Sequence, residues 1–225
     1  MKYAQFCPVA KASEVVGERW MLLVIRELVS GATSFGELQR GLGSISPSVL
    51  STRLKALVEH GIIERVEAGS SKGRHYRLTQ AGLELAPIIE TIGNWGGRWV
   101  RSRMTRDELD VELLMLHIGR NFDAAAFPKQ HAVVAFVFSD LHGPARRWWL
   151  LLNEGKAELC TDFPGRPEDV VLTSSLRTLA EFFNGDIGIQ AALAEGRLEA
   201  KGPPQLVRNT HRWLRPSPLA ASALR

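Results

Sequence analysis

The sequence predicts an α+β fold divided into two domains. The first half reads as helices with one short hairpin, whereas most of the second half reads as β-strands followed by helices. Charge divides the chain in the same way: residues 1–105 carry 14 Lys and Arg against 9 Asp and Glu, and residues 106–225 carry 14 against 15. A basic domain beside a neutral one indicates a polyanionic partner for the first alone. We therefore expect one domain at 1–105 and another at 106–225.

Three helices are expected before residue 43. Residues 8–18 form a short first helix, and residues 19–31 form a second that is apolar on most faces and should be central. A third helix follows at 33–42. If Ser34 is its cap, Glu37 stands three residues later, where a capping box needs an acid.

The helix expected at 46–60 has the strongest start signals, with Ser46 as its cap and Pro47 as its first residue. Its apolar residues recur at helical spacing and make one narrow stripe that should face the core. These residues are Leu50, Leu54, Leu57 and Val58. Gly61 ends the helix. With the helix at 33–42, it forms a pair spaced like a helix-turn-helix.

A β-hairpin should follow this helix pair, because "IIERVEA" and "RHYRLT" alternate around the loop "GSSKG". Thr79 then caps a long helix at 80–104, in which Pro87 predicts a kink. This helix carries more apolar surface than one small core needs. Part of it should therefore pack on another chain or another domain.

The flank of the 46–60 helix opposite its leucines combines small hydroxyls near the N-terminus with cations along the side. Short side chains allow close approach to a DNA major groove, and a helix N-terminus favours phosphate. Cations of the hairpin would touch the sugar-phosphate backbone or the minor groove. The predicted DNA-contacting residues are Ser34, Ser46, Ser48, Val49, Thr52, Arg53, Lys55, Lys72, Arg74 and His75. The alternative is a plain surface helix beside a solvated loop; the ordered set of features favours DNA.

The stretches "CPV", "GERWMLLVIREL", "SFGELQRGLGSISPSVLSTRLKALVEHGIIERV", "YRLTQAGLELAPII" and "WGGRW" carry a family resemblance. Residues 7–99 resemble the HxlR-type branch of winged-helix bacterial transcription regulators. The resemblance implies a DNA-binding homodimer built mainly from terminal helices, with a recognition helix at 46–60 and a wing at 62–79. The wing tip "AGSSKGRHY" departs from the proline-containing turn that is frequent in this family.

Cys7 precedes a proline at the start of the first helix, where a thiolate is stabilised. Some relatives of the family use an N-terminal cysteine as a redox sensor, so the resemblance makes Cys7 a candidate sensor. The alternative is a thiol packed under the long helix.

The second half should hold an antiparallel sheet covered by helices, because its β-branched and aromatic runs are bounded by Gly, Pro, Asn or Asp. The expected strands are 131–140, 145–155, 156–164, 168–175 and the short run "RLEAKG". The expected helices are 111–122, 175–185, 187–196 and 203–214.

This order of elements resembles the sterol-carrier-protein-like fold, which implies an apolar tunnel between sheet and helices. A hydrophobic effector there would gain about 0.8 kcal/mol per buried methylene. The candidate lining residues are Val134, Phe136, Phe138, Trp149, Leu151, Phe182, Phe183, Ile189 and Leu193. The alternative is that the same residues form an ordinary hydrophobic core.

No enzymatic motif is recognisable. The six histidines and two cysteines lack metal-ligand spacing, and neither a nucleophile elbow nor a phosphate-binding loop is present. We therefore expect no catalysis, cofactor or metal. Two cysteines, no signal-peptide pattern and no apolar run of membrane-spanning length predict a cytoplasmic protein without a membrane partner.

The function predicted from the sequence is that of a dimeric transcription regulator, possessing two recognition helices for a pseudo-palindromic DNA operator. An apolar ligand in the second domain would shift DNA affinity. Two alternatives stay open: a lipid carrier or enzyme whose first domain only dimerises, and a scaffold whose second domain has no ligand.

Overall fold

The computed structural model of the chain describes residues 2–67, 74–100 and 109–220. The chain forms two compact units, residues 1–93 and residues 94–225, each with its own core. The predicted joint at 102–110 and the hairpin tip, including Lys72, lie almost wholly outside the described residues.

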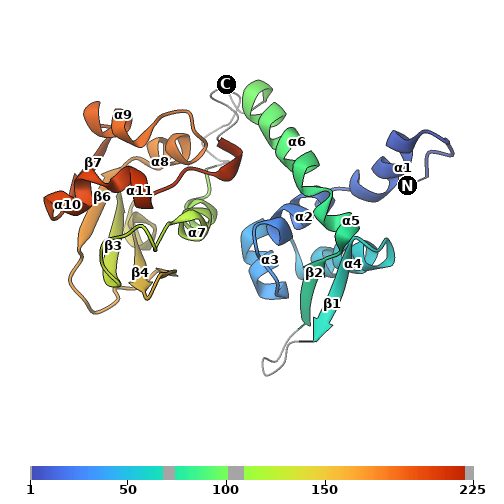
Figure 1. The fold of residues 1–225 in the computed structure, drawn as a ribbon, viewed down its shortest axis with the longest axis horizontal. Helices are drawn as coiled ribbons and strands as arrows, with labels where there is room; N and C mark the ends of the chain where they lie inside the picture. The colour runs from blue at the N-terminus through green and yellow to red at the C-terminus, as the bar shows by residue number, and fades with distance from the viewer. Residues whose placement is uncertain (1, 68–73, 101–108, 221–225) are drawn as a thin grey trace. The chain divides into compact units, whose positions relative to one another are not determined.

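In the first unit, helices surround a two-stranded hairpin, as Figure 1 shows. The α-helical and β-strand bounds are α1 (Pro8–Val16), α2 (Met21–Val29), α3 (Phe35–Leu42), α4 (Pro47–Glu59), β1 (Ile63–Glu67), β2 (Arg74–Leu78), α5 (Gln80–Leu83) and α6 (Ala86–Trp99). β1 and β2 pair in antiparallel register from Ile63 opposite Leu78 to Glu67 opposite Arg74. The predicted helix pair and hairpin are confirmed.

α2 begins two residues later than expected because Trp20 adopts a left-handed backbone conformation with φ of 80°. This conformation is unusual for a bulky residue. The guanidinium of Arg19 lies over the indole ring, 5.3 Å from its centroid. The turn between α1 and α2 is therefore a defined local structure.

The predicted leucine stripe of α4 is buried: Leu50, Leu54 and Leu57 are almost wholly inaccessible to solvent. They share one core with residues of α2, α3 and the hairpin, including Ile25 and Leu38. Val58, the fourth predicted position, is half-buried at the edge of this core. The stripe thus fixes which flank of α4 faces outward.

The predicted long helix after the hairpin is two helices, α5 and α6, rather than one kinked helix. Thr79 caps α5, accepting a hydrogen bond at 3.3 Å from the Gly82 N–H. Its hydroxyl also donates to the carbonyl of Gly61 at 2.6 Å. Pro87 occupies the first turn of α6, where a missing N–H costs nothing, so the chain breaks before the proline.

The second unit holds a five-stranded sheet in the order β5-β4-β3-β6-β7. Its helices and strands are α7 (Val111–Asn121), β3 (His131–Phe138), β4 (Arg147–Asn153), β5 (Lys156–Cys160), β6 (Val170–Ser174), α8 (Leu176–Phe183), α9 (Ile189–Ala194), β7 (Leu198–Lys201), α10 (Pro204–Arg208) and α11 (Thr210–Trp213), with 3-10 turns η3 (Gly143–Arg146) and η4 (Pro218–Ala220). The expected terminal helix is divided at Asn209 into α10 and α11.

The expectation of a wholly antiparallel sheet is wrong in one pairing: β3 and β6 run parallel, from Val134 opposite Val170 to Phe138 opposite Ser174. The other neighbours are antiparallel. β4 occupies one side of β3, so the chain after β5 crosses to the other side, and β6 runs in the same direction as β5 and β3. Residues from α7 to α11 share one large core with the sheet.

Gly82 gives a test of how tightly α5 closes on the hairpin base. A Cβ at this position would lie 2.2 Å from the carbonyl oxygen of Ile62. We expect Gly82→Ala to lower the free energy of unfolding by about 1–3 kcal/mol, the usual range for overpacking. The matched control is Gly36→Ala in α3, where a Cβ meets no atom within 4 Å. Urea titration of the parent and both variants measures the free energies of unfolding. A Gly82→Ala variant as stable as the Gly36→Ala control would contradict the close packing.

Candidate nucleic-acid interface

The outward flank of α4 carries Ser48, Ser51, Thr52 and Lys55, all exposed. Their spacing of three, four and seven residues from Ser48 places them on one face of the helix. The side chain of Lys55 is 73% exposed and lies 3.7 Å from the carboxylate of Glu59. The sequence analysis missed Ser51, although its spacing from Ser48 could have indicated it.

The N-terminus of α4 is capped by Ser46, whose hydroxyl accepts a hydrogen bond from the Val49 N–H at 3.4 Å and lies 3.2 Å from the hydroxyl of Ser48. The predicted cap is therefore confirmed. The Val49 side chain packs against the core and is half-buried. A DNA contact by either Ser46 or Val49 stays a prediction.

The wing is joined through β2 to the start of α3. The Tyr76 N–H donates to the carbonyl of Thr33 at 2.7 Å, and Ser34 forms a β-bridge with His75. The Thr33 hydroxyl lies 3.4 Å from Nδ1 of His75. Residues 33–34 thus lie beside β2 through an isolated β-bridge, which holds His75 beside the N-terminus of α3.

Ser34 closes the predicted capping box with Glu37. The Glu37 carboxylate accepts hydrogen bonds from the backbone N–H groups of Thr33 and Ser34 at 2.8 and 3.0 Å. These bonds favour the ionised form and lower the pKa of Glu37 from 4.5 to about 2. The carboxylate therefore ties the wing-binding segment to α3 across the neutral pH range.

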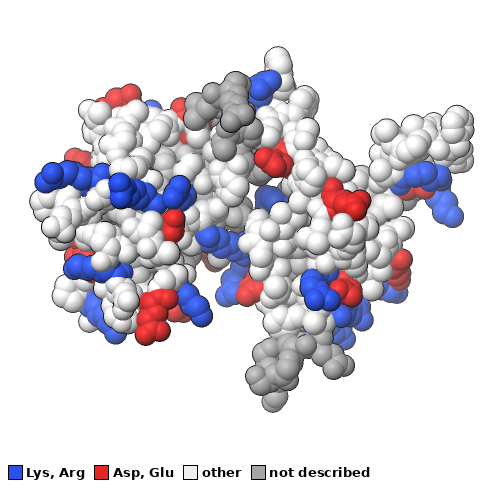
Figure 2. Space-filling view, in the orientation of Figure 1, with Lys and Arg blue, Asp and Glu red and all other residues white. Residues whose placement is uncertain are grey.

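The strands of the hairpin carry exposed cations. Arg74 is exposed at the start of β2, and Arg77 pairs with the Glu64 carboxylate across the strands at 2.6 Å. Figure 2 shows Lys and Arg side chains around this end of the first unit, with Asp and Glu interspersed.

Arg53 lies at the edge of the α4 face, but its side chain turns toward the turn between α1 and α2. Its Nε donates to the carbonyl of Arg19 at 2.9 Å, and its Nη1 forms an ion pair with the Glu18 carboxylate. The predicted contact of Arg53 with DNA stays a prediction, and no local pattern indicated Glu18 as its partner.

One face of α6 carries a stripe of exposed apolar side chains. Ile88, Ile92, Trp95 and Trp99 recur at helical spacing, and the two tryptophans are 60% and 64% exposed. Large exposed apolar patches mark interaction surfaces. The sequence predicted that this segment carries surplus apolar surface.

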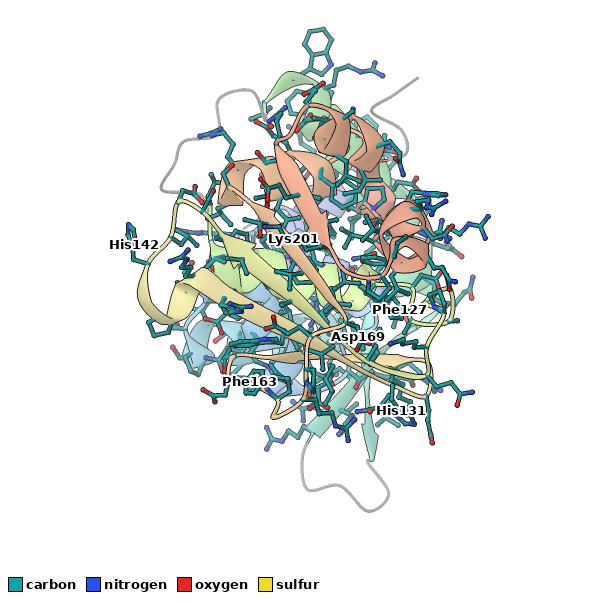
Figure 3. The ribbon with its side chains drawn as sticks, turned by 90° about the vertical axis from the view of Figure 1, so that its left-hand side faces the viewer. Phe127, His131, His142, Phe163, Asp169 and Lys201 are labelled. Atoms are coloured by element: carbon teal, nitrogen blue, oxygen red, sulfur yellow. The ribbon has the colours of Figure 1, made fainter. Side chains whose placement is uncertain are left out.

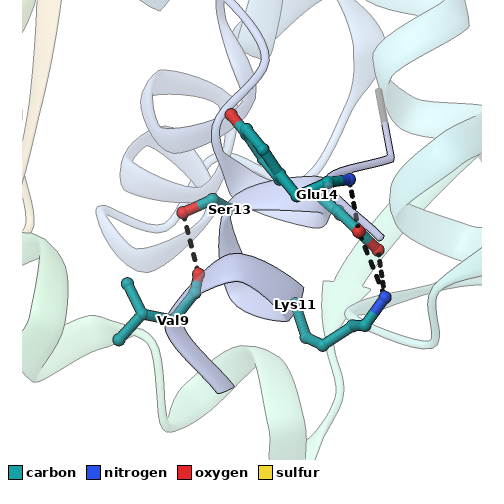
Figure 4. Close-up of polar contacts among 5 residues, drawn as sticks. Val9, Lys11, Ser13 and Glu14 are labelled. Carbon is teal, nitrogen blue, oxygen red and sulfur yellow. Dashed lines mark hydrogen bonds and ion pairs between the residues drawn. The ribbon is translucent and has the colours of Figure 1, made fainter. Parts of the chain in front are cut away.

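The segment before α1 folds back on that helix. The Tyr3 N–H donates to the Glu14 carboxylate at 2.8 Å, and Lys11 pairs with the same carboxylate at 3.1 Å (Figure 4). Cys7 is the N-cap residue of α1 and is half-buried. Its role as a redox sensor stays a prediction.

The nine residues predicted to line a tunnel do not surround one space. Seven of them belong to the large core of the second unit or pack against it: Val134, Phe136, Phe138, Phe182, Phe183, Ile189 and Leu193. Trp149 and Leu151 lie on the opposite face of the sheet, with Val133 and Ala135. That part of the prediction is wrong. Trp148 and Leu150 pair with Phe136 and Val134 and face the large core, so the alternating residues Trp149 and Leu151 face the other side.

The second sheet face has its own contacts. The Trp149 indole N–H donates to the Glu168 carboxylate at 2.7 Å, and that carboxylate pairs with Arg147 at 2.6 Å. Phe163 packs edge-on against Trp149, with ring centroids 6.0 Å apart. Figure 3 labels Phe163 and Asp169, which lie in the segment between β5 and β6.

Within residues 2–67, 74–100 and 109–220, no group of three or more His, Cys, Asp or Glu side chains could hold a metal ion. In that same part of the chain, no helix has the length and hydropathy needed to cross a bilayer.

A helix pair whose second helix exposes hydroxyls and a cation, beside a hairpin anchored to the first, defines a winged helix-turn-helix protein. Residues 15–104 match the HxlR-like helix-turn-helix family, and residues 120–215 match the SCP-2 sterol transfer family.

Relatives with the same first unit are regulators. The uncharacterized HTH-type transcriptional regulator Mb3122 of Mycobacterium bovis is 39% identical over 127 residues, 52% of this chain and 80% of that protein. YvaP of Bacillus subtilis, an uncharacterized HTH-type transcriptional regulator, is 34% identical over 102 residues, 44% of this chain and 94% of YvaP. The reduced form of the transcriptional regulator YodB from B. subtilis is 26% identical with a TM-score of 0.38, over 44% of this chain and all of that chain.

The chain belongs to the HxlR-like family of helix-turn-helix transcriptional regulators and carries an SCP2 domain at its C-terminus. Both resemblances and the α+β fold class predicted from the sequence are confirmed.

Glu37→Gln tests the link between α3 and the wing. Because the folded pKa of Glu37 lies below its unfolded value, its contribution is present above about pH 4.5 and is lost as pH falls toward about 2. We expect the free energy of unfolding of the variant to be about 1 kcal/mol lower than that of the parent at neutral pH. This difference should become smaller as the pH falls. Urea titrations across this range measure it, with Glu90→Gln on α6 as the control. A difference independent of pH would contradict the assignment.

Proposed function

We propose that the protein binds a pseudo-palindromic DNA operator as a homodimer, with α4 as the helix that enters the major groove. The observation that carries this proposal is the outward flank of α4. It exposes small hydroxyl side chains between Ser48 and Thr52, followed by Lys55, on the side of the helix opposite the buried leucine stripe. Small side chains admit the backbone close to base edges, and a cation reaches phosphate. Membership of a regulator family supports the same conclusion.

The wing supplies a second contact in this proposal. Arg74 and His75 begin β2 at the loop end of the hairpin, and Thr33, Ser34 and Glu37 join this strand to α3. A wing held in this way would reach the sugar-phosphate backbone beside the groove that α4 occupies. Lys72 would extend that contact.

The apolar stripe of α6 supplies the dimer contact in this proposal. Four large side chains exposed on one helical face are costly in water, and a second copy of the same helix would cover them. A two-fold dimer places two copies of α4 about one DNA turn apart, roughly 34–36 Å, which fits a pseudo-palindrome. Such a regulator acts in the cytoplasm.

A hydrophobic ligand of the SCP2 domain is the second part of the proposal, and the match to the SCP-2 sterol transfer family supports it. Phe136, Phe182 and Ile189 belong to the core where such a ligand would bind, between sheet and helices. A ligand that prefers one spacing of the two DNA-binding units would shift operator affinity. Mass spectrometry of an organic extract of the protein purified from its host identifies it; an extract with no bound small molecule would favour the scaffold alternative.

Lys55→Gln tests the placement of α4 on DNA. The probe is a duplex that the parent protein selects from a random-sequence library. We expect weaker binding and a salt dependence of log Kd reduced by about 0.9 per protomer, since one phosphate contact is lost. Lys201→Gln is the matched control, because Lys201 is similarly exposed, 77% against 73%, and also lies 3.7 Å from a glutamate. Equal salt slopes for both variants would remove α4 from the interface.

Trp95→Ser combined with Trp99→Ser tests the dimer. We expect the double variant to sediment as a monomer at concentrations where the parent is a dimer, because two large indoles leave the interface. Its DNA affinity should fall as well, since the second half-site is no longer bound cooperatively. Glu90→Ser, on a different face of α6, is the control. A double variant that stays dimeric would place the interface elsewhere.

A further inference from the structure

We propose that Arg53 is a positioning residue that holds α4 at the correct rotation for DNA through Glu18 and Arg19, and that it does not itself contact DNA. This inference rests on the proposed function and replaces the DNA contact that the sequence predicted for Arg53.

The geometry of Arg53 shows two directed contacts with one short segment. Its Nε donates to the Arg19 carbonyl at 2.9 Å, while Nη1 pairs with the carboxylate of Glu18. The donors of a guanidinium are fixed in one plane, so contacts with two neighbouring groups define its direction as well as its position. The side chain is only 21% exposed, which limits its reach toward an external ligand.

The segment that Arg53 contacts is a suitable fixed point. It precedes Trp20, whose left-handed backbone and stacked Arg19 give the turn one defined shape. Met21, the next residue, is buried in the core that also holds the leucines of α4. The turn between α1 and α2 is therefore attached to the core that holds α4.

α4 needs such a fixed point because its leucines define the inward face but resist rotation weakly. Leu50, Leu54 and Leu57 form a narrow stripe, and apolar contacts have no direction. A rotation of about 20° would move side-chain ends, roughly 5–6 Å from the helix axis, by about 2 Å. That displacement exceeds the tolerance of a hydrogen bond to a base edge. Arg53, at the edge of the stripe, is placed to prevent it.

Removing the charge of Glu18 distinguishes a positioning role for Arg53 from a direct phosphate contact, because the two roles predict opposite changes in DNA affinity. If Arg53 positions α4, removing the Glu18 charge releases the helix and weakens DNA binding. If Arg53 contacts phosphate, Glu18 competes with the DNA, and removing its charge strengthens binding.

The experiment measures Kd against salt for the library-selected duplex with the parent, Glu18→Gln, Arg53→Gln, Arg53→Lys and the exchange Glu18→Arg with Arg53→Glu. We expect each single variant to bind about three- to tenfold more weakly, as for coupled pairs. The exchange should recover only the part of the loss that comes from the ion pair, because a carboxylate at position 53 cannot donate to the Arg19 carbonyl. Arg53→Lys should also lose affinity, because it keeps the charge but not the planar donors. The salt slope should match that of the parent throughout.

Three outcomes would overturn the inference. One is tighter binding by Glu18→Gln, and another is a salt slope reduced by about 0.9 per protomer in Arg53→Gln. The third is parent-like DNA affinity in variants whose thermal unfolding shows only lost stability. Failure of the proposed function is a separate result: the parent would then select no duplex from the library, and Lys55→Gln would have no binding to weaken.

Discussion

The burial of Leu50, Leu54 and Leu57 is the constraint on which the first unit depends. Burying one leucine side chain fully contributes about 1.5–3 kcal/mol to the free energy of folding, relative to leaving it exposed. The stripe therefore determines which flank of α4 is exposed to solvent. The polar residues of α4 proposed for DNA then follow from helical spacing. The same stripe contacts α2, α3 and the hairpin, so one set of side chains places the helix pair and the wing together.

Polar contacts complete what the apolar core leaves undetermined. The Thr33 carbonyl and the Glu37 carboxylate join the wing to α3, and the Thr79 hydroxyl joins the end of α4 to α5. Hydrogen bonds have direction, whereas hydrophobic contacts do not. These hydrogen bonds therefore define how β2 and the end of α4 are oriented against α3 and α5.

Sequence reasoning succeeded where the signal is local. The caps at Ser34 and Ser46, the leucine stripe and the hairpin all rest on residues within a few positions of one another. It failed where the answer depends on distant partners. The parallel pairing of β3 with β6 and the pairing of Arg53 with Glu18 join segments whose proximity no local pattern encodes.

The adjacent tryptophans of β4 have a consequence for how the sheet assembles. Trp148 and Trp149 face opposite sides, as do Leu150 and Leu151, so sliding the strand by one position would put a similar side chain in almost every interior place. Features at the strand's two ends then help to set its alignment: Arg147 pairs with Glu168, Asn153 lies beside His131, and the turn at Glu154–Gly155 joins β4 to β5. A folding intermediate with β4 shifted by one residue would bury almost as much apolar surface as the native sheet. It would lose the polar pairs at the ends of the strand, and that loss favours the native alignment.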